Sequence, residues 1–302
     1  MITSQRGVPR RITVWAPAKV NLDLRILSRR PDGYHELRTI LQSIALRDTL
    51  SLRARRGPLT IRSRTSWVPQ DDANVIWQAA CGLWRALRRS GTPQDVAITI
   101  RKVIPTEAGL GGGSSDAAAA LRGLSALWAE PADDTILAKV ASRVGSDVPF
   151  FLTGGTALGT GCGEKMHHLE QLHRHWVVLA MPSYGVPTAD AYRWWDAIET
   201  ASVRSPRTRV GWTTRLGSLG NDLERPVTAR HPEIKVVVDR LRVEGAVLAA
   251  MSGSGSAVFG LFARRDAAVT ARLAVRRAGW RTILTRTMAG GEFARVARVR
   301  IG

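Results

Sequence analysis

Apolar and polar residues alternate along several short stretches in the first third of the chain, which is typical of half-buried β-strands. A different pattern, with apolar residues at helical spacing, covers Ala73–Ser90 and predicts a helix with Asp72 as its N-cap. The predicted strands around this helix are Ile12–Ala16, Leu22–Leu27, Thr49–Arg55, Leu59–Arg64 and Val96–Lys102.

The rest of the chain mixes both patterns without a strict alternation of strand and helix, which predicts an α+β fold rather than a doubly wound sheet. A domain boundary is predicted near Thr153–Lys165, and Ser202–Gly220 is predicted to be a long surface loop. The predicted helices are a segment ending near Trp128, then Thr135–Val144, Asp190–Thr200, Pro232–Glu244 and Asp266–Ala278. The predicted strands are Trp176–Met181, Val247–Ala250, Val258–Phe262, Thr282–Arg286 and Phe293–Arg300, and an apolar run covers Val148–Leu152.

Composition places the chain among ordinary globular proteins. It has 302 residues, of which 44% are hydrophobic and 23% charged, enough for one large or two medium domains. No apolar run approaches the roughly 18 residues of a membrane helix, and Met1–Arg11 lacks the apolar segment of a secretory signal. Cys81 and Cys162 are too few for a disulfide framework or a zinc set, so we expect a reduced, cytoplasmic protein with Cys81 in its core.

The net charge of +19 is the unusual feature of the composition, and arginine supplies 39 of the 44 basic residues. Such a field attracts nucleic acid, anionic membrane surfaces and phosphorylated small molecules. The arginines are spread along the chain without interleaved aromatic residues, so a nucleic-acid partner is not expected. A preference for arginine on a solvated surface explains the charge equally well.

The run Pro105–Asp116 carries most of the functional information. Its glycines, Gly109, Gly111, Gly112 and Gly113, allow backbone N–H groups to approach a bulky anion, and an alanine-rich helix follows. A glycine-rich loop that opens onto a helix N-terminus is a phosphate site. The run lacks the lysine of a P-loop and the third glycine of a dinucleotide fingerprint. A flexible linker is the alternative, but the flanking segments have ordered patterns.

Two further clusters lie near the start of the chain. Lys19 and Asn21 flank the start of a strand, where a mobile positive charge and a side chain that both donates and accepts stand close together. Pro31-Asp32-Gly33 is typical of a tight turn. Tyr34 and His35 follow it directly and are a pair suited to binding a planar heterocycle. A solvated lysine and an ordinary loop aromatic are the alternative interpretations of these residues.

Two clusters lie further along. Asp147, within Gly145–Phe151, is a lone carboxylate before an apolar run and is a candidate general base or metal ligand. It is equally well placed to cap the turn that follows. The small residues of Met251–Ser256 form either a plain hairpin or a second surface facing a ligand.

Taken together, the order and spacing of these clusters resemble the kinase superfamily that includes galactokinase, homoserine kinase, mevalonate kinase and phosphomevalonate kinase. Its three motifs match Pro17–Asn21, Pro105–Ala119 and Met251–Ser256. Within it, the chain is similar to the branch that phosphorylates 4-diphosphocytidyl-2-C-methyl-D-erythritol. That closer resemblance rests on Arg29–Leu37, Gly145–Phe151, Asn221–Glu224 and Met251–Ser256, and extends from about Val14 to Phe262.

The resemblance implies an N-terminal domain, residues 1–163, with a ribosomal-protein-S5-like fold, and a ferredoxin-like C-terminal domain, residues 164–302, with the active site in the cleft between them. It also implies ATP-dependent phosphorylation of the substrate's 2-hydroxyl in the non-mevalonate isoprenoid pathway, with Mg²⁺ accompanying ATP. The partner is then a small molecule that bears a cytidine diphosphate group, without membrane or nucleic acid.

The resemblance further implies roles for single residues. Asp147 would be the base and Lys19 its charged partner. Asn21 and His35 would hold substrate, and Tyr34 and Tyr192 would enclose the cytosine. Ser115 is the candidate hydroxyl ligand of Mg²⁺. The nucleotide-binding residues would be Pro105, Ala108, Gly109, Leu110, Gly111, Gly112, Gly113, Ser114 and Ser115.

Two rival functions remain open at this point. The same phosphoryl transfer to homoserine, mevalonate or a sugar would leave Pro31–His35 without a role, because these acceptors have no base to stack. A nucleic-acid-binding protein would leave Lys19 and Asp147 unexplained. Cys162 stands where the family usually has a larger or basic residue, and the arginine-rich stretch Ser202–Arg215 matches no motif.

Overall fold

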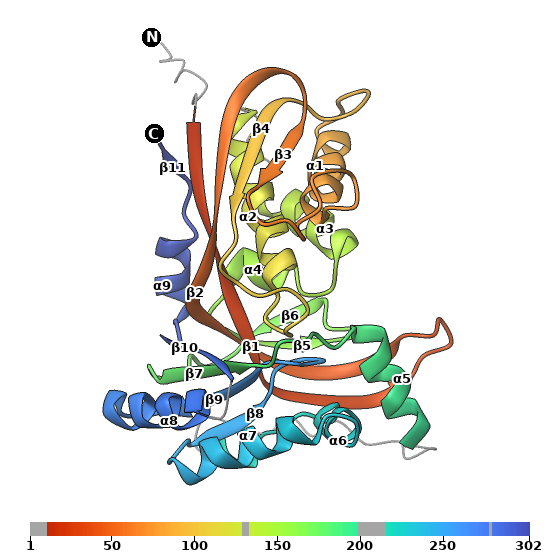
Figure 1. The fold of residues 1–302 in the computed structure, drawn as a ribbon. Coiled ribbons are helices and arrows are strands. Elements are labelled where there is room, and N and C mark those ends of the chain that lie inside the picture. The colour runs from red at the N-terminus through yellow and green to blue at the C-terminus, as the bar shows by residue number, and fades with distance from the viewer. Residues whose placement is uncertain (1–10, 129–132, 199–215, 278–279) are drawn as a thin grey trace.

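The computed structural model describes residues 11–128, 133–198, 216–277 and 280–302. Two β-sheets lie one above the other, and helices cover the first sheet on one face and the second sheet on its outer face (Figure 1). Mixed sheets and helices without strict alternation confirm the predicted α+β class. None of the helices in these ranges has the length and apolar character needed to cross a bilayer.

The first sheet has seven strands and is built on two long antiparallel strands, β1 and β2, which extend downward to contact the second sheet (Figure 1). Its main order is β11-β1-β2-β4-β3, and β5 pairs with both β2 and β6. These strands are β1 (Arg11–Arg29), β2 (His35–Pro58), β3 (Thr60–Ser63), β4 (Gln94–Arg101), β5 (Thr156–Thr160), β6 (Lys165–His168) and β11 (Arg300–Ile301).

The second sheet has four antiparallel strands in the order β10-β7-β9-β8. Its strands are β7 (Trp176–Met181), β8 (Leu248–Met251), β9 (Val258–Phe262) and β10 (Arg281–Arg286). The helices of this part are α5 (Thr188–Ile198), α6 (Glu224–Thr228), α7 (Pro232–Val243) and α8 (Arg265–Arg277). Pro232 occupies the first turn of α7, as predicted, because its missing N–H has no partner to lose there.

The helices on the first sheet are α1 (Val75–Ala86), α2 (Gly112–Leu127), α3 (Asp134–Val144), α4 (Phe150–Thr153) and, near the other end of the chain, α9 (Gly290–Val296). The helix α2 is buried along most of its length, and its alanines allow close packing on the sheet. At Gly123 even a single added carbon would lie 2.8 Å from Leu52. This close packing fixes the N-terminus of α2 relative to β1, which matters for the site.

Strands β7, β8 and β9 of the second sheet are buried on both faces, which explains their continuous apolar runs, whereas β10 is partly exposed. Along β7, Val177 and Leu179 point toward the β1–β2 pair, whereas Val178 and Ala180 point toward the helices. The β1–β2 pair is thus held between two cores.

Most predicted elements are confirmed, with β7 and β9 at the predicted bounds. The largest difference lies in β1 and β2, because the polar residues between the predicted short strands belong to the strands themselves. The Pro-Asp-Gly turn at 31–33 is confirmed and connects the two. Part of the predicted loop Ser202–Gly220 and the ends of the predicted helices Asp190–Thr200 and Asp266–Ala278 lie outside the described residues.

Three predictions are wrong. Phe293–Arg300 is not a strand, because α9 covers its first half and Phe293 packs into the core of the first sheet. Asp72 does not cap α1; the side chain of Asn74 accepts the hydrogen bond from the Ile76 N–H instead. Cys81 is only partly buried, because it lies on the edge of α1 that faces α3 rather than the sheet.

Candidate active site

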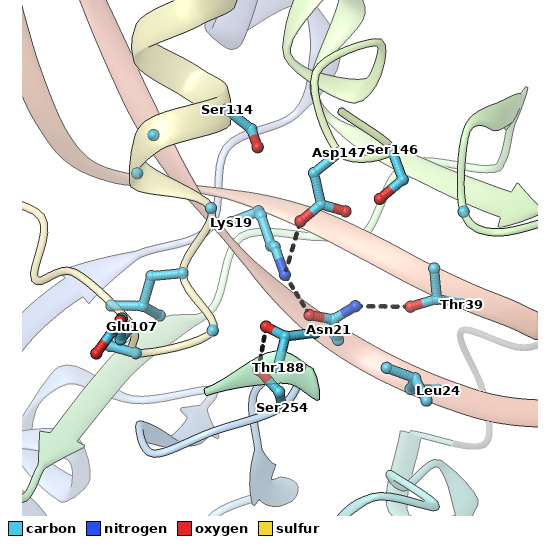
Figure 2. A pocket seen from close by; sticks show the side chains of 18 of the residues that line it. Lys19, Asn21, Leu24, Thr39, Glu107, Ser114, Ser146, Asp147, Thr188 and Ser254 are labelled. Atoms are coloured by element: carbon cyan, nitrogen blue, oxygen red, sulfur yellow. Dashed lines mark hydrogen bonds and ion pairs between the residues drawn. The ribbon is translucent and has the colours of Figure 1, made fainter. Parts of the chain in front are cut away.

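Lys19 and Asp147, predicted from separate motifs, meet in the structure. The Lys19 Nζ lies 3.3 Å from Asp147 Oδ2 and donates to Asn21 Oδ1 at 2.6 Å (Figure 2). The Lys19 side chain is 4% exposed and that of Asp147 is 29% exposed, so the carboxylate faces solvent while the ammonium is enclosed. An irregularity in the pairing of β1 with β2 between Pro17 and Ala18 accompanies the change of strand direction here.

Asn21 connects the motifs to one another. Its Nδ2 donates to Thr39 Oγ1 at 2.7 Å, and its backbone N–H donates to Ser252 Oγ at 3.3 Å. The Ser252 hydroxyl in turn donates to the Gly109 carbonyl at 2.9 Å. The segment Met251–Ser256 is therefore more than a plain hairpin, since it packs against both the strand motif and the glycine loop.

The glycine loop has a form that requires glycine at specific places. Gly109 and Gly111 have φ angles of +70° and +69°, in the left-handed region. A Cβ at Gly109 would lie 1.9 Å from the Ser252 carbonyl oxygen. No side chain caps α2, and its first turn contains no acidic residue. The first N–H groups of the helix have no partner within it, so they and the positive helix end are available to an anion.

A cavity of about 430 Å³ opens between the loop and the Lys19–Asp147 pair. Asp147 and Ser146 border it from one side and Thr188 and Ser254 from the opposite side (Figure 2). Of the predicted site residues, the cavity is lined by Lys19, Asn21, Pro105, Ala108, Gly109, Leu110, Gly111, Gly112, Gly113, Ser114, Asp147 and Tyr192.

Ser115 differs from its neighbours in the loop. It is 2% exposed, and its hydroxyl donates to the Pro17 carbonyl at 2.6 Å. Its side chain therefore connects α2 to β1, whereas the neighbouring Ser114 borders the cavity.

A second cavity, of about 940 Å³, adjoins the first, since Ser146, Cys162 and Tyr192 line both. Tyr34 and His35 border this second cavity. Tyr34 is 66% exposed.

His35 is enclosed by residues of α5. Its ring stacks on Tyr192 with 4.9 Å between centroids, and Trp195 contacts its edge. Its Nε2 lies 2.7 Å from Asp196 Oδ1. Burial, and then the charge of Asp147, raise the pKa of Tyr192, so its phenol keeps its proton.

Several lining residues were not anticipated from the sequence. Thr39 and Thr188 are single polar residues within an apolar strand and at the start of a helix, without a motif of their own. Asp196 follows Tyr192 by one helical turn, and that spacing is the signal that could have revealed it. No group of three or more His, Cys, Asp or Glu side chains in the described ranges is arranged to hold a metal ion.

The fold and the loop define a class of small-molecule kinases. The family model described as "GHMP kinases N terminal domain" matches residues 74–155, and "GHMP kinases C terminal" matches residues 212–280. Crystal structures of a mevalonate kinase (TM-score 0.66, 14% identity, 92% of this chain and 99% of that one) and of homoserine kinase from Cytophaga hutchinsonii (0.67, 18%, 99% of both) share the fold.

More similar relatives narrow the class. The 4-diphosphocytidyl-2-C-methyl-D-erythritol kinase of Moorella thermoacetica is 44% identical over 289 residues, covering 92% of this chain and 99% of the relative. That of Geobacter sulfurreducens is 38% identical over 281 residues, covering 92% and 100%. A crystal structure of such a kinase superimposes with a TM-score of 0.76 at 35% identity, covering 92% and 100%. The chain belongs to the 4-diphosphocytidyl-2-C-methyl-D-erythritol kinase family of the GHMP kinases.

Proposed function

We propose that the protein transfers the γ-phosphoryl group of ATP to the 2-hydroxyl of 4-diphosphocytidyl-2-C-methyl-D-erythritol, giving the 2-phosphate and ADP in the non-mevalonate isoprenoid pathway. The observation that carries this proposal is the Lys19–Asp147 pair beside an uncapped, glycine-rich helix N-terminus. Membership of this kinase family supports the choice of substrate.

In this proposal, the oxygen of the substrate hydroxyl forms the new bond to the γ-phosphorus, and Asp147 accepts the proton of that hydroxyl. The bond between the γ-phosphorus and the bridging oxygen of the β-phosphate breaks, so that ADP leaves. The transition state is loose, so positioning and charge neutralisation supply most of the catalysis. The Lys19 ammonium offsets negative charge at the reacting centre, and Asn21 holds Lys19 in place. The N–H groups of Gly111–Ser114 would receive the phosphates.

The second cavity is the proposed site of the cytosine. Tyr34 and Tyr192 both border it and are suited to enclose a planar base. His35, stacked behind Tyr192 and held by Asp196, would contact the base with its remaining polar atoms. The two cavities share Tyr192 and Ser146, so one extended substrate would reach from Tyr34 to Asp147.

The lining also fits ATP with Mg²⁺. Magnesium in kinases is bound mainly by phosphate oxygens and water, with one or two protein ligands. The Ser114 hydroxyl, which borders the cavity, would supply such a ligand better than the engaged hydroxyl of Ser115. Bound there, the ion would offset the charge of the transferring phosphoryl group.

We also propose the finer description of the architecture and surroundings. The strand and helix order β7-α5-α6-α7-β8-β9-α8-β10, with sheet order β10-β7-β9-β8, supports a ferredoxin-like C-terminal domain. An S5-like N-terminal domain would end near residue 163, with α9 and β11 returning to it. The same proposal places the protein in the cytoplasm without a nucleic-acid partner.

The test is incubation of the purified protein with ATP, Mg²⁺ and 4-diphosphocytidyl-2-C-methyl-D-erythritol, following ADP release and product mass. We expect substrate-dependent ADP and a product heavier by one phosphate, with inhibition by cytidine diphosphate. Turnover of homoserine, mevalonate or a sugar, without competition by cytidine diphosphate, would assign the site to another acceptor.

A further inference from the structure

A second lysine lies between two carboxylates directly behind the glycine loop. Lys102, at the end of β4, is 5% exposed, and its Nζ donates to Asp48 Oδ2 at 2.5 Å and to Asp116 Oδ2 at 2.7 Å. The side chains of Asp48 and Asp116 are 0% and 6% exposed. None of these three residues lines either cavity described above.

Asp48 holds the chain where it enters the loop. Its Oδ1 accepts hydrogen bonds from the backbone N–H groups of Val103, at 2.5 Å, and Ile104, at 2.9 Å. Pro105, the first residue of the nucleotide loop, follows immediately. Three hydrogen bonds from consecutive residues to one buried carboxylate therefore fix the direction in which the loop leaves β4.

Asp116 holds the chain where it leaves the loop. It lies on α2, just beyond the helix turn whose N–H groups face the cavity. The Lys102 Nζ passes close beneath this turn, 3.3 Å from the position that a Cβ at Gly112 would occupy. Lys102 thereby connects both ends of the loop through Asp48 and Asp116.

The charges of this cluster do not balance, so the cluster is not the arrangement expected if its purpose were stability alone. Two buried carboxylates share one ammonium, and Asp116 Oδ1 has no hydrogen-bond partner in the part of the chain that the structure describes. A buried polar atom without a partner costs free energy, and buried ion pairs are frequently replaceable by neutral side chains without loss of stability. A neutral residue at position 116 would leave Lys102 paired with Asp48 alone, one charge against one.

We propose that Asp48, Lys102 and Asp116 form a positioning cluster that holds both ends of the ATP loop in the conformation that receives the phosphates. This inference rests on the proposed ATP-dependent function. None of the three residues touches the reacting atoms; they act through the loop, by reducing the conformational freedom that ATP binding would otherwise remove. The unbalanced charge is retained because the second carboxylate connects Lys102 to α2.

The test is Asp116→Asn, with Asp116→Ala as the variant that removes the acceptor completely. We expect the KM for ATP and the Kd for a non-hydrolysable ATP analogue to rise on the order of tenfold. The KM for the cytidine-bearing substrate should be unchanged, and kcat at saturating ATP should fall less than the KM rises. The thermal midpoint of Asp116→Asn at pH 8 should equal or exceed that of the wild type.

Leu124→Ala is the matched control, since Leu124 is buried on the same helix away from the loop. It should lower the thermal midpoint without changing the KM for ATP. If Asp116→Asn behaves like this control, the cluster is only structural and the proposal is wrong.

Amide hydrogen exchange of the free protein separates this inference from the proposed function. With or without turnover, Asp116→Asn should speed exchange over residues 106–113, and unchanged exchange would overturn the cluster's role. A wild-type protein that binds no ATP would instead overturn the proposed function.

Discussion

Lys19, on β1, and Lys102, the residue after β4, lie on either side of the glycine loop, and they differ in what surrounds them. Lys19 has one carboxylate partner, Asp147, which is 29% exposed at the cavity. Lys102 has two partners, Asp48 and Asp116, which are almost completely buried. In the two proposals above, the same pair of residue types serves two purposes: the more exposed carboxylate would receive a substrate proton, and the buried ones would hold the chain.

Adjacent glycines of the loop separate the two lysines. A Cβ at Gly111 would lie 3.1 Å from Lys19 Cε, and a Cβ at Gly112 would lie 3.3 Å from Lys102 Nζ. The loop is thus packed against one lysine on each side. The comparison predicts that variants on the Lys19 side change the rate of the chemical step, whereas variants on the Lys102 side change ATP binding and stability.

The largest expected effect is that of Asp147→Asn on the rate. An amide cannot accept the hydroxyl proton, so kcat should fall by a factor on the order of 10²–10⁴ with substrate affinity little changed. Steady-state kinetics measures this, with Asp239→Asn on the surface of α7 as the control that keeps kcat. A rate within a few-fold of wild type would remove Asp147 from its proposed role.

Replacing each lysine in turn should distinguish the two clusters by how far the free energy of unfolding falls. Lys102→Met leaves two buried carboxylates without a cation and should lower the free energy of unfolding by about 3–5 kcal/mol. Lys19→Met leaves one carboxylate that is in contact with solvent and should cost about 1 kcal/mol or less, while kcat falls. Urea unfolding of both variants provides the comparison, and equal losses of stability would contradict it.

The third prediction concerns pH. Burial, opposed by the charge of Lys102, raises the pKa of Asp116 to about 7 from its ordinary value of 3.8. Folding therefore favours the protonated form, and this contribution to stability is complete below about pH 4 and is lost as pH rises through 7. The loss is on the order of 2–4 kcal/mol. Unfolding free energies of wild type and Asp116→Asn between pH 4 and 8 should diverge accordingly; parallel curves would refute the assignment.

Replacing a residue remote from both lysines should leave the proposed roles of Lys19 and Lys102 unchanged. Tyr34→Ala removes an exposed ring from the second cavity and should weaken binding of cytidine diphosphate by roughly 1–3 kcal/mol, as expected for base stacking. Calorimetry should show ATP binding unchanged. Equal affinity of wild type and variant for cytidine diphosphate would argue against a base site at Tyr34.

The smallest expected effects come from the two glycines that separate the lysines. Gly111→Ala introduces a Cβ at φ +69°, 2.8 Å from Phe151, and should lower kcat through Lys19. Gly112→Ala crowds Ile104 and Lys102 and should raise the KM for ATP. The change in each kinetic constant should correspond to a free-energy difference of about 1–2 kcal/mol. If both variants changed the same kinetic constant, the two sides of the loop would not be separable.

The sequence was most informative where local physics and motif spacing agree. The glycine loop, the Lys19 and Asn21 motif and Asp147 were recognisable because their residue types suit phosphate and proton chemistry at short spacing. Strands β7, β8 and β9 of the second sheet were predictable because both of their faces are buried, which gives unbroken apolar runs such as Trp176–Met181.

Prediction failed where tertiary contacts override local preference. Polar residues such as Gln42 and Ser43 interrupt the apolar pattern of β2, although they are buried. Hydrogen bonds to distant segments satisfy them, as when Gln42 Nε2 donates to the Met288 carbonyl at 2.8 Å. Phe293–Arg300 was predicted to be a strand, yet its first part belongs to the helix α9, which packs Phe293 into the core. Asp72 and Asn74 are both good caps, and only the chain path selects Asn74.

By itself, then, the sequence determined the class of fold, because that depends on the order of local hydrophobic patterns. Residue type and spacing also predicted a phosphate loop, and the resemblance to a kinase family supplied the residues of the proposed chemistry. The tertiary structure alone decided that Asp196 holds His35 and that Lys102 lies between Asp48 and Asp116, and it supplied the distance between Lys19 and Asp147, a pair expected from the family resemblance. These contacts join residues on different elements, and their distances follow from how the sheets and helices pack, which no local pattern encodes.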